Sequence, residues 1–81
     1  MNLQVQLFAA ARDAAGQSPV EVRLPAGGSV GDLREQLLQD FPNMTSMAML
    51  LFVAVNNEYA EDDHLLNETD TIACFPPVSG G

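Results

Sequence analysis

The first residues of the chain alternate between apolar and polar side chains. Leu3, Val5 and Leu7 are separated by polar residues, which is the pattern of a strand with one buried face. Residues 20–24 repeat this alternation and predict a second strand, which we expect to pair with the first in antiparallel orientation. Between the two, the sequence "AAARDAAG" predicts a short helix that ends at Gly16.

A longer helix is predicted next. Ser29 is suited to cap its N-terminus, and Asp32 places a carboxylate three residues later, in the first turn. Pro42 ends the helical pattern. The apolar side chains of this segment recur at intervals of three and four residues and form a stripe that we expect to cover a sheet: Val30, Leu33, Leu37, Leu38 and Phe41.

The middle of the chain predicts a loop followed by a hairpin. Residues 43–49 form a loop or ragged turn whose methionines, at positions 44, 47 and 49, are expected to pack adaptably. Residues 50–55, "LLFVAV", are continuously apolar and predict a central strand buried on both faces. Asn56 and Asn57 tolerate the positive φ of a tight turn into a short return strand at residues 58–60.

A polar loop and a last strand complete the pattern. Residues 61–70 are polar except for Leu65 and Leu66, which we expect to hold the loop in place, and residues 71–75 predict the final strand. The order of elements is typical of the α+β ubiquitin-like β-grasp fold, a mixed sheet wrapped round one main helix, with the first and last strands side by side. We expect a β-grasp domain over residues 1–76 and a flexible C-terminal Gly-Gly tail projecting over residues 77–81.

The composition agrees with one small domain. The 81 residues are 47% apolar, which suits a folded core and not a disordered chain. Eleven acidic residues, three arginines and no lysine give a net charge of −8. This charge repels phosphate backbones and anionic membranes, so we expect no nucleic acid and no membrane partner; a basic protein partner is favoured, with solubility alone as the alternative explanation. No basic leader or long apolar run is visible, and we expect a cytoplasmic protein.

The body of the chain lacks the pattern of a catalytic or cofactor site. His64 follows two aspartates, but adjacent residues rarely coordinate one ion, so a solvated loop is favoured over a metal site. Cys74 lies in the last strand and is expected to pack as a small hydrophobe. The glycines of residues 26–31 lack the Gly-Lys-Ser/Thr sequence of a phosphate-binding loop, so no tightly bound cofactor or nucleotide is expected.

The last seven residues, "FPPVSGG", predict a projecting tail. Pro76 and Pro77 cannot donate backbone hydrogen bonds and prefer extended geometry, so they end the last strand. Residues 78–81 can reach about 13–14 Å when extended. Without Cβ atoms, Gly80 and Gly81 can enter a channel too narrow for other residues. A frayed, inert end is the alternative.

Docking of such a tail requires a surface on the body of the protein, because ordering a flexible segment costs about 1–2 kcal/mol per residue. Phe75, at the root of the tail, and Phe8 are the candidates for this partner-binding surface, together with Pro76 and Pro77. For Phe75, packing in the core is an equal alternative. Val78 and Ser79, between the prolines and the glycines, and Gly80 complete the set of predicted partner-binding residues.

Residues 53–81, "VAVNNEYAEDDHLLNETDTIACFPPVSGG", together with the order of elements before them, resemble the small sulfur-carrier subunits of molybdopterin synthase. The "VN" turn, the "D-x-(apolar)-A" strand and the terminal "FPPVSGG" carry the resemblance. It implies that an E1-like activating enzyme uses ATP to adenylate Gly81, that the adenylate becomes a thiocarboxylate, and that the large synthase subunit uses the sulfur to build the molybdopterin dithiolene.

The same resemblance implies that Gly81 is the one reactive residue and that catalytic acids and bases lie on the large subunit. The chain would then be a protein cosubstrate more than an enzyme, in a heterotetramer of two carriers around a dimer of large subunits. Three alternatives stay open: a sulfur carrier for thiamine or tRNA thiolation, a ubiquitin-like modifier that forms isopeptide bonds, and a plain interaction domain. Since the chain has no lysine, it cannot build ubiquitin-style chains on itself.

Overall fold

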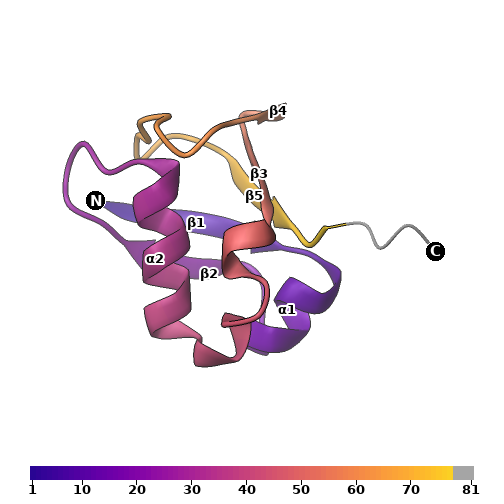
Figure 1. Ribbon diagram of the computed structural model, residues 1–81. Helices are drawn as coiled ribbons and strands as arrows, with labels where there is room; N and C mark the ends of the chain where they lie inside the picture. Colours follow the sequence, from indigo (N-terminus) through magenta and orange to yellow (C-terminus); the bar gives the residue numbers. More distant parts are fainter. Residues whose placement is uncertain (78–81) are drawn as a thin grey trace.

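The computed structural model describes residues 1–77 of the chain. These residues form a five-stranded sheet, two α-helices and two short 3-10 turns (Figure 1). In chain order the elements are β1 Asn2–Leu7, α1 Ala9–Ala15, β2 Val20–Arg23, α2 Val30–Asp40, η1 Pro42–Met44, η2 Ala48–Leu50, β3 Phe52–Val55, β4 Glu58–Tyr59 and β5 Ile72–Phe75.

The sheet is mixed, with the strand order β2-β1-β5-β3-β4. β1 and β5 are parallel, with Val5 opposite Ile72 and Leu7 opposite Cys74. The other neighbouring pairs are antiparallel: β1 with β2, β3 with β5, and β3 with β4. The predicted mixed sheet of a β-grasp fold, with its first and last strands side by side, is therefore confirmed.

The hydrophobic core lies between the sheet and α2, which crosses one face of the strands (Figure 1). Alternate residues of each long strand point to this inner face, because successive side chains of a strand lie on opposite sides of the sheet. The buried apolar side chains are Leu3, Val5, Leu7, Ala11, Val20, Val22, Leu24, Val30, Leu33, Leu37, Met44, Ala48, Leu51, Val53, Val55, Leu66, Ile72 and Cys74.

The predicted start of the main helix is confirmed in detail. The Ser29 hydroxyl accepts a hydrogen bond from the Asp32 backbone N–H at 3.2 Å, and the Asp32 carboxylate accepts one from the Ser29 N–H at 2.9 Å. This reciprocal capping box satisfies two of the donors that a helix start leaves without partners. The helix gives way to η1 at Pro42, as expected.

The long loop before β5 is attached to the same helix end. The N–H groups of Val30 and Gly31 donate to the carbonyls of His64 and Asp62, both at 2.9 Å. Arg34, which is only 8% exposed, donates from Nε to Asp62 at 2.7 Å and from Nη1 to the Ala48 carbonyl at 3.0 Å. One buried guanidinium thus holds α2, the loop and η2 together, and its charge is paired, as burial requires.

Two predicted turns have the expected backbone. Gly16 follows α1 with φ of 80° and donates its N–H to the Arg12 carbonyl, which is the left-handed helix cap that glycine favours. Asn56 and Asn57 have φ of 53° and 70° and connect β3 to β4. Two consecutive positive φ values give the turn that matches the twist of a hairpin.

Three expectations for the second half of the chain are wrong. Residues 50–55 do not form a strand buried on both faces: the strand begins at Phe52, which is 49% exposed, and β5, not β3, occupies the centre of the sheet. Leu65 is 62% exposed, so Leu66 alone of the two leucines is buried. Met49 is also exposed, whereas Met44 packs in the core. The first error arises because α2 covers only one face of the sheet, so the outward residues of β3 stay exposed.

We expect Ser29→Ala to lower the free energy of unfolding by about 1 kcal/mol, because it removes the cap of α2. Chemical denaturation measures the change. The matched control is Ser46→Ala, since Ser46 is an exposed loop serine without a hydrogen bond between residues 1 and 77 of the structure. Equal stability of the two variants would contradict a role for the capping box.

Candidate partner-binding surface

The parallel pairing of β1 and β5 places the C-terminal ends of both strands at one edge of the molecule. Phe8 directly follows β1, and its N–H donates to the Cys74 carbonyl at 3.2 Å. Phe75 is the last residue of β5. The two phenylalanines are far apart in the sequence, and the ladder between the two strands makes them neighbours in space.

The rings of Phe8 and Phe75 stack on each other. Their centroids are 4.8 Å apart and their planes differ by 7°. Phe8 is 43% exposed and Phe75 is half-buried. Since Ile72 and Cys74 point into the core, the alternation along β5 directs Phe75 to the opposite, outer face. Of the two alternatives for Phe75, packing in the core or a position on the surface, the structure therefore supports the second.

Two further aromatic residues extend this surface across the sheet. Phe52 of β3 lies opposite Phe75 in the ladder with β5, and Tyr59 of β4 lies 5.8 Å from Phe52, ring centre to ring centre, with a tilt of 53°. Both are exposed, Phe52 by 49% and Tyr59 by 77%. We call Phe8, Phe52, Tyr59 and Phe75 the aromatic surface.

Sequence reasoning missed Phe52 and Tyr59. The apolar run of residues 50–55 concealed the alternation of β3, in which Val53 and Val55 are buried whereas Phe52 is exposed. The sequence did contain a signal for both residues. Asn56-Asn57 predicts a two-residue turn, and such a turn determines which residues of the two adjoining strands lie opposite each other. Tyr59 thereby falls opposite Ala54, on the face shared with Phe52.

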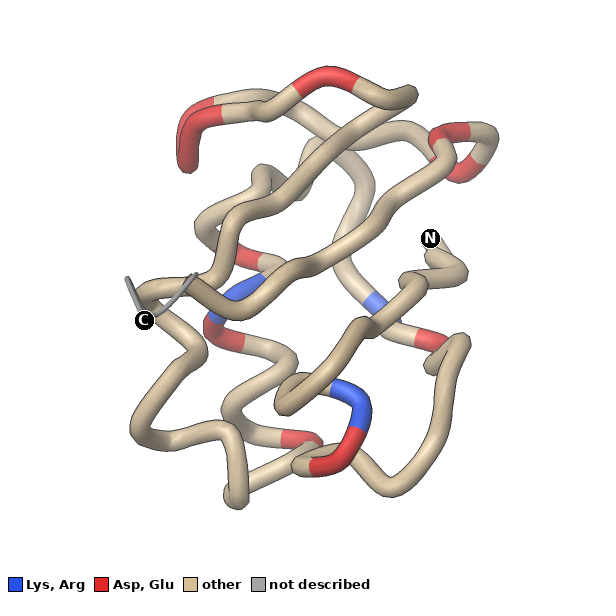
Figure 2. The backbone as a smooth tube through the Cα atoms, turned by 90° about the vertical axis from the view of Figure 1, so that its right-hand side faces the viewer, with Lys and Arg blue, Asp and Glu red and all other residues tan. Residues whose placement is uncertain are grey.

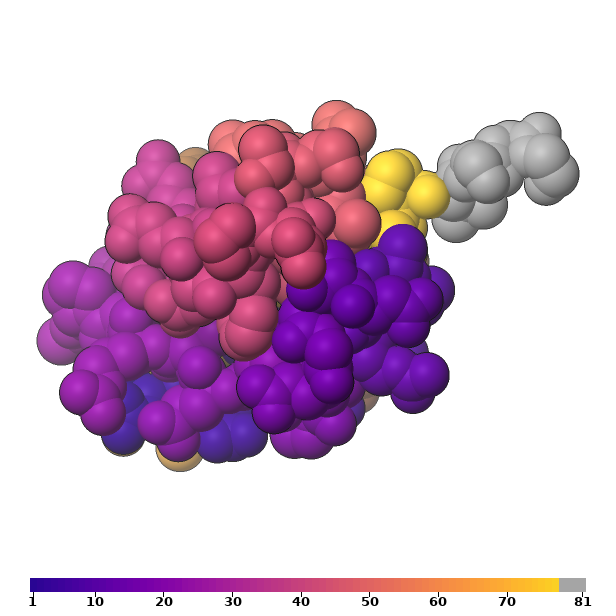
Figure 3. All heavy atoms as spheres, turned by 90° about the horizontal axis from the view of Figure 1, so that it is seen from below, coloured from indigo at the N-terminus to yellow at the C-terminus, as the bar shows by residue number. Residues whose placement is uncertain are grey.

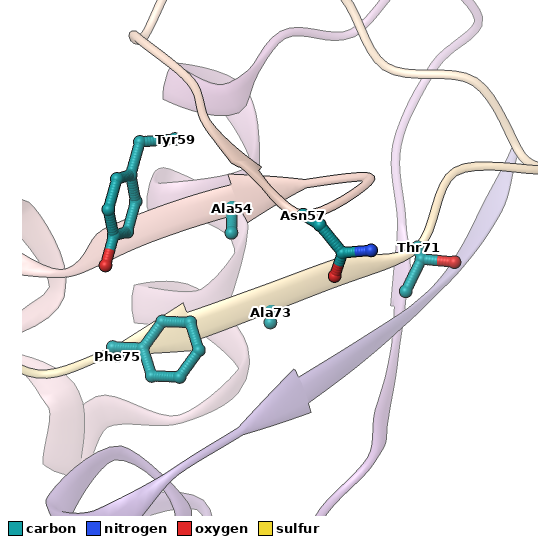
Figure 4. A pocket seen from close by; sticks show the side chains of 6 residues that line it. All are labelled: Ala54, Asn57, Tyr59, Thr71, Ala73 and Phe75. Carbon is teal, nitrogen blue, oxygen red and sulfur yellow. The ribbon is translucent and has the colours of Figure 1, made fainter.

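A hollow lies between the aromatic side chains. Its volume is about 250 Å³, and its lining residues are Ala54, Asn57, Tyr59, Thr71, Ala73 and Phe75. Figure 4 shows the two alanines at its floor, the rings of Tyr59 and Phe75 at one end, and Asn57 and Thr71 at the other. We call this hollow the socket.

The chain leaves the sheet next to the aromatic surface. Pro76 is half-buried and Pro77 is exposed. In the view from below, the end of the described chain, coloured yellow, lies between α1 in indigo and the coral segment that contains η2 (Figure 3). The remaining predicted site residues, Val78, Ser79, Gly80 and Gly81, lie outside the residues that the structure describes, so their roles stay predictions.

Charged residues are scarce at this edge. Residues 71–77 and β3 contain no charged side chain. Figure 2 looks at this side of the molecule: most acidic positions lie in the loops and on α2, whereas β1, β3 and β5 are uncharged. An apolar centre poor in charge, surrounded by polar residues, is the usual composition of a protein–protein interface.

Cys74 lies at the end of β5 but its sulfur faces the core. Burial raises the pKa of its thiol to about 12, and the positive charge of Arg34 only partly opposes this shift. At neutral pH the group is therefore a neutral thiol without access to solvent, which makes it a poor nucleophile. This agrees with the packing role predicted for Cys74.

Residues 1–77 contain no group of three or more His, Cys, Asp or Glu residues placed to hold a metal ion. None of the helices in this part of the chain has the length and apolar character needed to cross a membrane.

The described residues form a β-grasp domain whose last strand ends beside an exposed aromatic surface, and this fold defines the class of ubiquitin-like small proteins. Residues 5–81 match the ThiS family, and the chain belongs to that family. It is 32% identical over 83 residues to the molybdopterin synthase sulfur carrier subunit of Chlamydomonas reinhardtii, and the alignment covers 100% of both chains.

Solved structures agree on the fold. A putative molybdopterin converting factor, subunit 1, from Pyrococcus furiosus has a TM-score of 0.86 at 29% identity, with 96% of this chain and 99% of that chain covered. SAMP1 from Haloferax volcanii has a TM-score of 0.85 at 28% identity, with full coverage of both chains. A complex of subunits 1 and 2 of molybdopterin-converting factor from Helicobacter pylori matches over 100% of both chains, with a TM-score of 0.69 at 21% identity, which supports the fold alone.

We expect the Cys74 thiol to resist alkylation in the folded protein. At pH 8, a thiol with a pKa of about 12 is almost entirely protonated, and burial excludes the reagent. Iodoacetamide followed by mass spectrometry tests this: we expect almost no adduct in buffer and complete modification in guanidinium chloride, which is the control for reagent activity. Rapid labelling of the folded protein would contradict the assigned burial.

Proposed function

We propose that this chain is the sulfur carrier subunit of a molybdopterin synthase, with Gly81 as the residue that carries sulfur. The observation that supports this most is the aromatic surface beside the last strand, in a chain of the ThiS family whose relative from Chlamydomonas reinhardtii carries that name. The two aligned chains coincide over their full lengths. The proposed function is therefore that of a carrier. The end of the chain reacts, and the partner binds the surface of the sheet.

The proposed chemistry begins with activation of a carboxylate. A carboxylate is a poor electrophile because its negative charge is delocalised over two oxygens. In the proposed reaction, an E1-like enzyme transfers AMP from ATP to the Gly81 carboxylate and releases pyrophosphate. Hydrogen sulfide from a sulfur donor then attacks the acyl carbon and displaces AMP, which leaves a thiocarboxylate. In this proposal the catalytic groups for these steps lie on the partner enzymes.

The partner proposed for the aromatic surface is the large subunit of the synthase. The sulfur must reach a substrate bound on that subunit, so the body of the carrier has to dock where its last strand ends. Phe8, Phe75 and Phe52 provide apolar area at that position. In the Helicobacter pylori structure, subunits 1 and 2 of the converting factor form a complex. By analogy with the family, we propose a heterotetramer of two carriers and two large subunits.

Charge favours such a partner over a second copy of the chain. Each copy has a net charge of −8, so two copies repel each other, whereas a basic surface is attracted. Arg34, one of only three arginines, is already paired with Asp62. We further propose that the protein works in the cytoplasm.

Thiamine and tRNA sulfur carriers share the fold and the Gly-Gly end, and a protein modifier would use the same activation. The name of the curated relative favours molybdopterin over these alternatives. A modifier would form an amide between Gly81 and an amine of a target. This chain has no lysine in its 81 residues, so it offers no such side chain itself.

We expect Gly81 to gain sulfur when the protein is incubated with its activating enzyme, ATP and a sulfur donor. Intact-protein mass spectrometry should show a mass increase equal to the difference between sulfur and oxygen, and fragmentation should place it at Gly81. A chain without Gly81 is the control and should stay unchanged. Lack of a mass change under conditions that activate a known carrier would overturn the proposal.

A second reaction tests the molybdopterin assignment. Addition of the large subunit and the pterin precursor to the sulfur-bearing chain should yield the dithiolene, and no product would exclude the molybdopterin assignment.

We expect Phe75→Ala to weaken binding to the large subunit about tenfold or more, as for an aromatic anchor at an interface. Isothermal titration calorimetry measures the affinity, and thermal unfolding measures stability. Leu65→Ala is the matched control, because Leu65 is 62% exposed and belongs to the loop between β4 and β5, outside the aromatic surface. Unchanged affinity with a strongly lowered melting temperature would assign Phe75 a structural role instead.

A further inference from the structure

We propose that the socket binds the guanidinium group of an arginine side chain supplied by the large subunit. This inference rests on the proposed function, because it names the contact by which the partner would recognise the sheet. It goes beyond that function in assigning a ligand to the hollow between β3, β4 and β5. The shape, the polarity and the charge of the socket support it.

The floor of the socket is made by two small side chains. Ala54 of β3 and Ala73 of β5 lie opposite each other in the ladder, and both face outward. Tyr59 and Phe75 rise at one end of this floor (Figure 4). Larger residues at the two alanine positions would fill the space. The volume of about 250 Å³ suits a single side chain of a partner.

The socket changes in character along its length. The end near Phe75 is aromatic, whereas Asn57 and Thr71 place an amide and a hydroxyl at the far end (Figure 4). Neither of these two side chains has a hydrogen bond to another group between residues 1 and 77. An occupant that fits both ends needs an apolar or planar stem and a polar head that donates hydrogen bonds.

One acidic residue lies close to the polar end: Asp70 precedes Thr71 and is bonded to Asn56, the neighbour of Asn57. Glu58 pairs with Val55, whose side chain is buried, so Glu58 is directed to the other face of the sheet. The Asp70 carboxylate accepts hydrogen bonds from the Asn67 N–H at 2.8 Å and from the Asn56 amide at 2.9 Å. These bonds lower the pKa of Asp70, so it stays ionised at neutral pH. No lysine or arginine lines the socket.

These properties together favour arginine over other side chains. A leucine or phenylalanine would leave the amide and hydroxyl of the polar end without partners, which costs free energy on burial. An acidic side chain would be repelled by the net charge of −8. Lysine has the right charge, but its compact ammonium group does not stack. The flat guanidinium stacks on aromatic rings and donates up to five hydrogen bonds.

A titration of the full chain with small capped amino acids tests the identity of the ligand. The probe is N-acetyl-arginine amide, with N-acetyl-citrulline amide as a neutral control of the same shape and N-acetyl-lysine amide as a charged control. We expect only the arginine probe to shift the NMR signals of the Ala54 and Ala73 methyl groups and of the Asn57 amide in a saturable way. Equal shifts with citrulline or lysine, or no shift with arginine, would overturn the proposal.

A variant tests the role of the socket in the complex. Ala73→Leu fills the socket, and we expect it to weaken binding to the large subunit about tenfold, as for loss of an interface anchor. Gln4→Leu is the matched control. Gln4 also lies on the outer face, but it pairs with a residue of β2 and is therefore away from the socket. Both variants should keep the melting temperature of the parent protein. Equal affinity of the two variants would contradict the proposal.

The sulfur assay separates this inference from the proposed function. Ala73→Leu leaves residues 76–81 unchanged, so Gly81 should gain sulfur in the variant as it does in the parent chain. If the parent chain gains no sulfur, the proposed function fails, whereas the arginine titration still reports on the socket. If sulfur is gained but arginine does not bind selectively, only the inference about the socket fails.

Discussion

The parallel pairing of β1 with β5 is the constraint on which the rest of the structure depends. Parallel neighbours cannot be joined by a tight turn, so the chain between them has to cross over the sheet. In this protein that path includes α2, which covers the inner face and buries the core. The same pairing aligns the ends of both strands and brings Phe8 onto Phe75. One ladder therefore builds the core and the candidate site together.

The two faces of the sheet have separate roles. The inner face packs against α2 through alternate aliphatic residues and supplies the stability. The outer face has no covering element in residues 1–77, and it carries the aromatic surface and the socket. Recognition can thus change by substitution at outward positions, such as Ala54 or Tyr59, without a change in the core. This division suits the proposed function as a carrier.

Much of the fold was predicted from local patterns, and the errors have a common origin. The alternation in β1, the cap at Ser29 and the turn at Asn56 depend on residues a few positions apart, which sequence inspection reaches. The apolar run at residues 50–55 is ambiguous, because the same residues suit a strand with one or two covered faces. Only the position of α2 decides between these cases, which is why Phe52 was not recognised as a surface residue.

For the site, the sequence by itself determined Phe8, Phe75 and the proline pair as candidates, and the resemblance to a known family supplied the role proposed for Gly81. The tertiary structure decided that Phe75 faces outward and stacks on Phe8, added Phe52 and Tyr59, and created the socket above Ala54 and Ala73. The physical reason is the range of the interactions. Helix caps, turns and the alternation of strands are set by neighbours in the chain. The aromatic surface depends instead on the registers between strands, which join segments up to about seventy residues apart. Local sequence does not encode these registers.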